Sequence, residues 1–229
     1  MAGPVVHPRV AARRGAARAT RWWGKAWVRA VEEAAYAEDD LARARALSRS
    51  GRISAITTRP GEFVAAVEGD HGLWTVAGTV PVLDGAAAEA LVETVAAESG
   101  RVAALLGGDL PHDLVEHAEE SGVELLPYGG ELGSSCPCEA WVDPCVHALA
   151  VLYQLAWLVD ADPFVLLQLR GLPRDELLAR LHQRSDDTPA DDDGERDVEA
   201  GLDAALRAAR VLDLVHDPED TDAPVGHLF

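Results

Sequence analysis

The most hydrophobic segment of the sequence is CVHALAVLYQLAWLVDAD, from Cys145 to Asp162. It is apolar on nearly every helical face, and a helix with that pattern is buried inside a protein rather than laid on its surface. The preceding residues, SCPCEAWVDP from Ser135 to Pro144, hold the other two cysteines of the chain. The sequence therefore predicts a core built around one buried helix, with a cysteine-rich segment at its start.

Four side chains with metal-binding chemistry gather at this helix start in the spacing C-x-C-x6-C-x-H, namely Cys136, Cys138, Cys145 and His147. Thiolate sulfur and imidazole nitrogen are soft ligands that suit tetrahedral zinc. Four protein ligands leave no coordination position open, which is typical of a structural site and not of a catalytic one. We therefore predict a structural Zn2+ held by these four residues.

The residues between the ligands indicate how the site forms. Pro137 is expected to hold the C-x-C pair in an extended turn, so that both sulfurs point to one ion. Asp143 and Pro144 are expected to cap the helix and to form its first turn, with Cys145 at the irregular helix entry. The alternative is a set of buried or redox-active cysteines beside an unrelated histidine.

The rest of the chain predicts an α+β fold. Residues 52–84 contain short apolar segments broken by turn signals, which is typical of an antiparallel meander. Asp84 is expected to cap a helix over 85–100, and a further helix is expected over 110–122. Helices that begin near Asp162 and Pro173 complete a small meander with several helices, in which a zinc knuckle leads into the buried helix.

Composition and charge divide the chain into segments. The net charge of −19 is made of +7 over residues 1–31, −15 over 32–184 and −11 over 185–229. We expect the following organisation: a disordered basic arm (1–19), an α+β domain (20–184) that contains the zinc finger (132–150), an acidic linker (185–195), a C-terminal helix (196–216) and a polar tail (217–229). The acidity does not require a binding partner, because solubility or adaptation to high salt also explains it.

Three features of composition bear on localisation. No apolar run reaches the roughly 18 residues that a membrane span needs, and the N-terminus lacks the apolar region of a secretory signal. Three cysteines in one stretch fit a reducing compartment. Nearly all basic residues are arginine, which indicates a GC-rich genome and, we expect, a bacterial protein. These features together predict a cytoplasmic location.

Basic and aromatic residues near the N-terminus suggest nucleic-acid contact. Trp23 and Trp27 lie four residues apart on the apolar stripe of a helix that Thr20 is expected to cap, and we expect both in the core. Trp22 lies off that stripe, where it is free to stack on a base while arginines contact phosphates. The candidates for nucleic-acid contact are Arg13, Arg14, Arg18, Arg21, Trp22 and Lys25.

At the four predicted ligands the sequence resembles the SWIM-type zinc finger family, whose motif is a C-x-C, a variable gap and a C-x-H at a helix start. The segments WWGKAW (22–27), RPGEFVAAVEG (59–69) and DPFVLLQLRG (162–171) also look like segments of bacterial SWIM-domain proteins, so that the resemblance covers about residues 21–181. It implies a zinc finger that binds DNA or protein. For the bacterial group it also implies a partnership with a Swi/Snf-type helicase.

An enzyme with an unrecognised active site is the alternative. The chain has no phosphate-binding loop, no dinucleotide fingerprint and no serine-hydrolase elbow. In HDLVEH, the histidines His112 and His117 are five residues apart, about 140° around a helix, so they do not clamp one ion from a single turn. We therefore expect a non-catalytic binding module that contacts a protein, a nucleic acid or both.

Overall fold

The computed structural model describes residues 3–14, 19–70 and 72–187. Its contacts divide the chain into a unit that ends at Leu181 and a second unit that begins at His182. Of the second unit only the end of one helix is described. The expected C-terminal helix (196–216), the polar tail (217–229) and most of the expected linker (185–195) lie outside the described residues. All that follows concerns the first unit.

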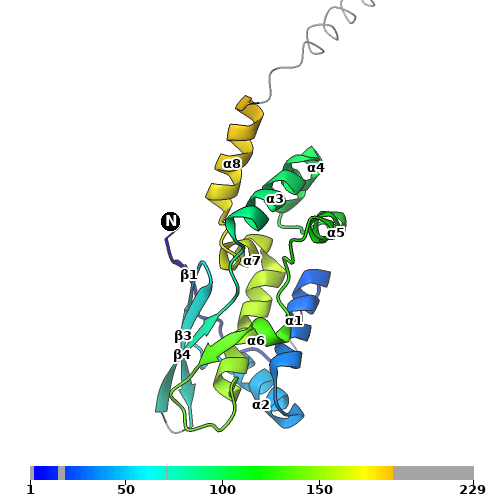
Figure 1. The fold of residues 1–229 in the computed structure, drawn as a ribbon. Coiled ribbons are helices and arrows are strands. Elements are labelled where there is room, and N and C mark those ends of the chain that lie inside the picture. The colour runs from blue at the N-terminus through cyan, green and yellow to red at the C-terminus, as the bar shows by residue number, and fades with distance from the viewer. Residues whose placement is uncertain (1–2, 15–18, 71, 188–229) are drawn as a thin grey trace, which may run out of the picture. The chain divides into compact units, whose positions relative to one another are not determined.

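The predicted α+β class is confirmed (Figure 1). Five antiparallel strands pair in the order in which they occur in the chain: β1 (Val5–His7), β2 (Ile56–Arg59), β3 (Glu62–Gly69), β4 (Gly72–Thr79) and β5 (Gly133–Ser135). The helices in the described part are α1 (Trp22–Ala34), α2 (Glu38–Arg49), α3 (Gly85–Ala96), α4 (Ser99–Leu106), α5 (His112–Glu120), α6 (Val146–Ala161), α7 (Pro163–Leu169) and α8 (Arg174–Asp187), with a 3-10 turn at Gly129–Glu131. None of these helices has the length and apolarity needed to cross a membrane.

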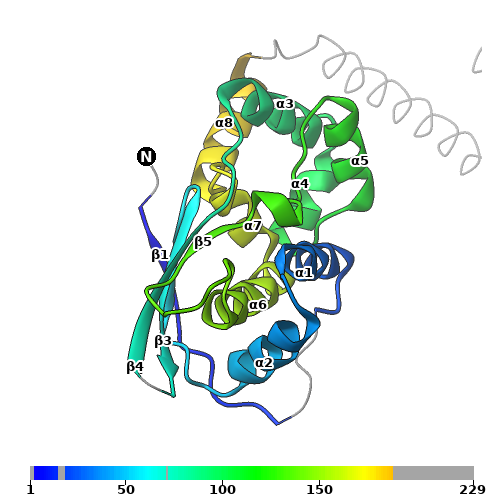
Figure 2. The same cartoon turned by 60° about the horizontal axis from the view of Figure 1, so that its bottom comes forward.

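Helix α6 is the central element of the unit. It lies between the sheet and the pair of helices α1 and α2, so that its whole circumference meets protein (Figure 2). Ten of its residues are buried, among them every residue from Ala148 to Ala156. The sequence pattern that is apolar on nearly every face is therefore satisfied by neighbours on all sides, and the prediction of a buried helix is confirmed.

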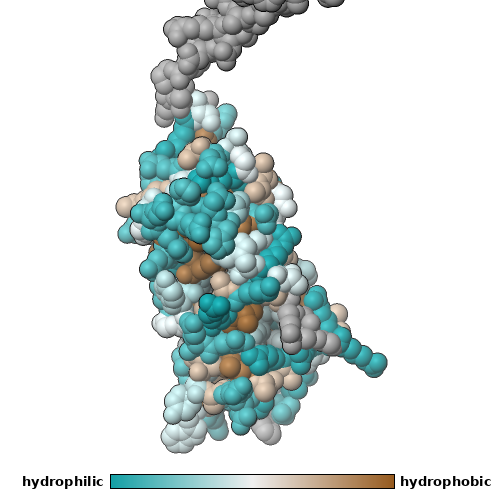
Figure 3. Space-filling model, turned by 90° about the vertical axis from the view of Figure 1, so that its right-hand side faces the viewer, coloured by the Kyte–Doolittle hydropathy of each residue, from teal (hydrophilic) through white to brown (hydrophobic). Residues whose placement is uncertain are grey.

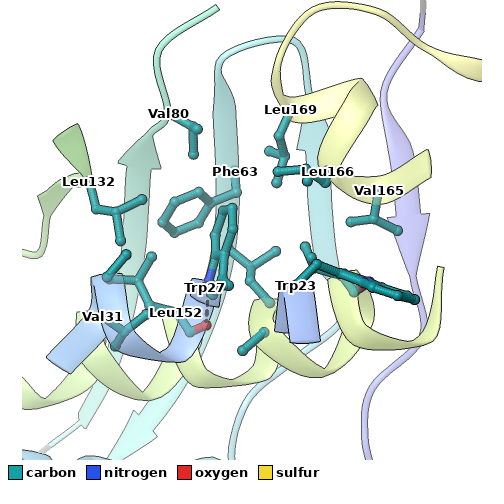
Figure 4. Close-up of a cluster of buried hydrophobic side chains, with 14 of the residues drawn as sticks. Trp23, Trp27, Val31, Phe63, Val80, Leu132, Leu152, Val165, Leu166 and Leu169 are labelled. Carbon is teal, nitrogen blue, oxygen red and sulfur yellow. Dashed lines mark hydrogen bonds between the residues drawn. The ribbon is translucent and has the colours of Figure 1, made fainter. Parts of the chain in front are cut away.

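The core beside α6 is built on two tryptophans of α1 (Figure 4). The side chains of Trp23 and Trp27 are 1% and 0% exposed, as their helical spacing predicts. Each indole N–H donates to a carbonyl of α6, Trp23 to Val159 at 2.8 Å and Trp27 to Leu152 at 3.3 Å. Buried indoles need such partners, so these two hydrogen bonds fix how α1 lies against α6.

The predicted meander is the part β2–β3–β4 of the sheet. Side chains alternate along β3, where Phe63, Ala65 and Val67 face the core and their neighbours face outward. Gly78 on β4 is required here because the Phe63 ring occupies the place of its side chain. The sheet thus has one face against the helices. Figure 3 views the unit from the side on which α1 and α5 lie in Figure 1, and the surface seen there is largely hydrophilic.

The N-terminal segment differs from the expectation of a disordered arm. Strand β1 pairs antiparallel with β2, with Val6 opposite Thr57. Further along, the Arg9 side chain donates to the carbonyl of Gly51 at 2.8 Å, and the backbone N–H of Arg13 donates to that of Arg49 at 2.9 Å. For the described residues 3–14 the prediction was wrong, because backbone pairing with distant segments orders a stretch that has no apolar period of its own.

The predicted cap of α3 is confirmed, α7 begins with a similar cap, and the predicted cap of α1 is wrong. Asp84 accepts a hydrogen bond from the backbone N–H of Ala87, and Asp162 accepts one from that of Phe164. Thr20 does not cap α1, whose N-cap is Arg21. The backbone N–H and the hydroxyl of Thr20 bond instead to the Asp160 carboxylate of α6, which ties the start of α1 to the central helix.

Candidate metal centre

The four predicted ligands come together where β5 ends and α6 begins. Strand β5 pairs with β4, with Ser135 opposite Ala77, and this pairing carries Cys136 and Cys138 to the N-terminal end of α6. Cys145 is the N-cap residue of α6, and His147 lies in its first turn. The four ligand atoms all lie within 4.8 Å of one another.

This geometry fits one tetrahedral metal ion. Zinc–sulfur bonds of about 2.3 Å place two sulfur ligands about 3.8 Å apart around a tetrahedral ion. The Cys136 Sγ lies 3.9 Å from the His147 Nδ1, and no pair in the group is more than 4.8 Å apart. The three cysteines are free thiols, so no disulfide competes for them. Among the described residues, no other cluster of this kind is found.

The helix start differs from the expected one. The N-cap is Cys145 and not Asp143, and the peptide bond between Asp143 and Pro144 is cis. The Asp143 carboxylate accepts a hydrogen bond from the Ser134 hydroxyl instead of capping the helix, and so links the loop to β5. Cys145 is therefore held at the irregular entry of the helix, from which both it and His147 reach the site.

Gly69, at the end of β3, contacts the Nε2 edge of the His147 imidazole, which faces away from the sulfurs. A Cβ on Gly69 would lie 2.9 Å from the His147 Nε2 and 2.8 Å from the Trp74 Nε1. The Trp74 and His147 rings lie 6.2 Å apart between centroids. The tip of the β3–β4 hairpin thus packs on the imidazole and leaves its Nδ1 toward the cysteines. Sequence reasoning missed Gly69 and Trp74, which are 78 and 73 positions away from His147.

Burial sets the protonation of the ligands in the absence of metal. It raises the pKa of Cys145 to about 12, while the other thiols and the backbone N–H of Ala148 modify this effect. Burial also raises the pKa of Cys136. Burial, together with the positive charge of Arg52, lowers the pKa of His147, so the imidazole is neutral at pH 7. A neutral imidazole binds a metal directly, whereas the thiols release protons when they bind one.

A groove of about 1100 Å³ opens beside the ligands. Its walls come from α2, from the hairpin tip and from the loop between Cys138 and Cys145. Trp141, in that loop, is 102% exposed, so its ring is open to solvent. Arg52 also lines the groove and pairs with Asp70 at 2.8 Å. Sequence reasoning also missed Trp141, whose only signal was its position between two metal ligands.

The described candidates for nucleic-acid contact lie in two segments of the chain, one at α1 and one after β1. Arg21 pairs with Asp109 at 3.7 Å and stacks over the Trp23 ring, and the Trp22 indole donates to the carbonyl of Leu110 at 2.9 Å. Lys25 is exposed on α1. Arg13 and Arg14 instead follow β1 along the C-terminal end of α2. Arg18 lies outside the described residues.

The histidines of HDLVEH do not share a site. His112 Nδ1 lies 3.2 Å from a carboxylate oxygen of Glu116 and its ring packs on Trp22, whereas the His117 Nδ1 lies 2.7 Å from the carbonyl of Asp113. The two imidazoles thus have separate partners on α5, as the sequence spacing indicates.

Fold and site together define an α+β protein with a Cys3His cluster able to hold a metal ion. Over 171 residues, or 73% of the chain, the sequence is 33% identical to a curated relative, "Uncharacterized protein Rv2102" of Mycobacterium tuberculosis. The chain spans 61% of that protein's length. No family model and no solved structure matches the chain. The resemblance to SWIM-type zinc fingers therefore stays a prediction.

Proposed function

We propose that the protein is a non-catalytic binding module of the SWIM type, whose fold is completed by a structural zinc ion. The convergence of three thiols and one imidazole within 4.8 Å at the start of the central helix is the observation that carries this proposal. A Cys3His set supplies four protein ligands and leaves no position for a substrate or a reactive water. Zinc is the ion that such a set prefers in a tetrahedral arrangement.

The position of the site explains why zinc would matter to the fold. The ligands join β5, the loop 136–145 and α6, and α6 contacts both the sheet and helices α1 and α2. Because the unfolded chain does not hold the four ligands in this arrangement, zinc binding contributes free energy of folding. A stabilised loop then presents Trp141 and the groove residues to a partner.

The proposed partners are a nucleic acid, a DNA-acting protein, or both, with a Swi/Snf-type helicase as the protein suggested by the family resemblance. Exposed aromatic and arginine side chains at the groove support a binding role, since such residues are typical of interaction sites. A direct test is the binding of purified helicase from the same genome to the zinc-loaded protein, with the Trp141→Ala variant as the comparison.

X-ray absorption spectroscopy on zinc-loaded protein tests the structural role of the metal. We expect three sulfurs at about 2.3 Å and one nitrogen at about 2.0 Å, without a bound water. A spectrum with an oxygen ligand in place of one of the four residues would indicate an open site. It would favour the alternative, an enzyme whose chemistry takes place at the metal.

A further inference from the structure

The strongest unexplained feature is a concentration of positive charge in a chain whose net charge is −19. Two segments, residues 3–14 and 41–52, contain seven arginines and no acidic residue. The two segments pack against each other at the C-terminal end of α2. The Arg9 side chain donates to the carbonyl of Gly51, and the backbone N–H of Arg13 donates to the carbonyl of Arg49. Each segment alone carries only three or four arginines, and folding brings them together into one positively charged region.

Three of the seven arginines are neutralised and four are not. Arg43 pairs with Asp40, Arg45 with Glu32 and Arg52 with Asp70. Within residues 3–14, 19–70 and 72–187, no ion pair is found for the remaining four, which we call the arginine cluster: Arg9, Arg13, Arg14 and Arg49. The cluster is a local positive field on an acidic protein, and such a field attracts polyanions.

The arginine cluster is held in place by the fold. Arg13 stacks over the Trp157 ring of α6 at 5.5 Å, and Ala12 packs against Gly51, whose φ of +75° ends α2. Arg13 therefore has a position set by α2 and α6 instead of sampling the space of a free arm, and Arg14 follows it directly in the chain. Ordered cations lose less entropy when they bind phosphates than cations on a flexible tail.

The cluster adjoins the groove at the metal centre. The groove is lined by Ser50, which follows Arg49 in the chain, and by Arg52. Trp74 and Trp141 line the same groove. Arginines that track a backbone next to exposed aromatic rings are the combination by which proteins bind single-stranded nucleic acid. A duplex keeps its bases stacked and presents none of them to an exposed indole.

We propose that a single-stranded nucleic acid binds at this surface, with its phosphates on the arginine cluster and a base stacked on Trp141. The proposal rests on the proposed function and names its ligand class and its contact residues. It moves the predicted contact away from Arg21, Trp22 and Lys25, since the Arg21 guanidinium and the Trp22 indole are already bonded within the domain.

Fluorescence anisotropy tests the surface with a labelled oligothymidine of about 15 nucleotides, at about 50 and 200 mM salt. The full-length zinc-loaded protein is compared with Arg14→Ala/Arg49→Ala, with Trp141→Ala and with the control Lys25→Ala/Arg29→Ala. The control removes two exposed positive charges from α1 and so changes the net charge as much as the first variant does. Zinc content and melting temperature of each variant report whether it folds.

We expect Arg14→Ala/Arg49→Ala to weaken binding about tenfold or more at low salt and to reduce the slope of log affinity against log salt by about 1.4. Trp141→Ala should weaken binding about fivefold or more, and the control about twofold or less. An equal loss in the control, an unchanged Trp141→Ala variant, or tighter binding of the duplex form would overturn the proposal. An absence of binding by the wild-type protein would do the same, while a full zinc content would leave the metal module standing.

Discussion

Replacement of Gly69 by alanine tests how the hairpin positions the metal ligand. The added methyl group would lie 2.9 Å from the His147 Nε2, whereas ordinary van der Waals contacts begin near 3.4 Å. The same group would lie 2.8 Å from the Trp74 Nε1, so both rings must move away from the methyl group to relieve the overlap. Gly69 does not have a positive φ, and alanine therefore adds no backbone strain.

Overpacking of this kind costs about 1–3 kcal/mol. If His147 moves away from the methyl group, the zinc ion binds more weakly. A free-energy cost of this size corresponds to about a 5- to 150-fold increase in the Kd for zinc. Gly130→Ala is the matched control, because a Cβ at Gly130 meets no atom within 4 Å. Competition with a chromogenic zinc chelator measures both affinities. Equal affinities for Gly69→Ala and the wild type would refute the placement of His147 against the hairpin.

Further predictions concern the ligands and the core. The pKa of Cys145 is raised to about 12 and that of Cys136 is also raised, so both thiols lose protons on binding. Protons therefore compete with zinc, and the two protons of Cys136 and Cys145 alone should raise the apparent Kd about a hundredfold for each pH unit below 7; a pH-independent Kd in the same chelator assay would contradict thiolate ligation. Leu152→Ala, at a side chain that is 0% exposed, should lower the free energy of unfolding by about 2–5 kcal/mol in urea titrations. Leu106→Ala, at a side chain that is 44% exposed, should change it by about 0.5 kcal/mol or less, and equal losses in the two would contradict the assigned core.

The features that the sequence predicted correctly are those that local pattern controls. The hydrophobic content of α6 requires burial whatever its neighbours are. Trp23 and Trp27 lie on one helical stripe, and Asp84 and Asp162 precede helices that need caps. The cysteine and histidine spacing likewise identified the ligand group that the fold brings together, because all four residues lie within one short segment.

The features that the sequence did not predict depend on contacts between distant segments. Strand β5, Gly133–Ser135, has little intrinsic preference for a strand and forms because it pairs with β4. Strand β1 forms against β2, about 50 residues away, which turns an expected flexible arm into an ordered edge of the sheet. The contact of Gly69 with His147 and the joining of the two arginine-rich segments arise in the same way, so no local pattern reports them.

Zinc stoichiometry is the most direct test of the proposed metal site. Protein purified without chelator from zinc-containing medium is analysed by inductively coupled plasma mass spectrometry, and the Cys136→Ser variant is treated in parallel. We expect one zinc ion per chain in the wild type and much less in the variant. A wild-type value well below one per chain, or an equal value in the Cys136→Ser variant, would contradict a zinc site formed by Cys136, Cys138, Cys145 and His147.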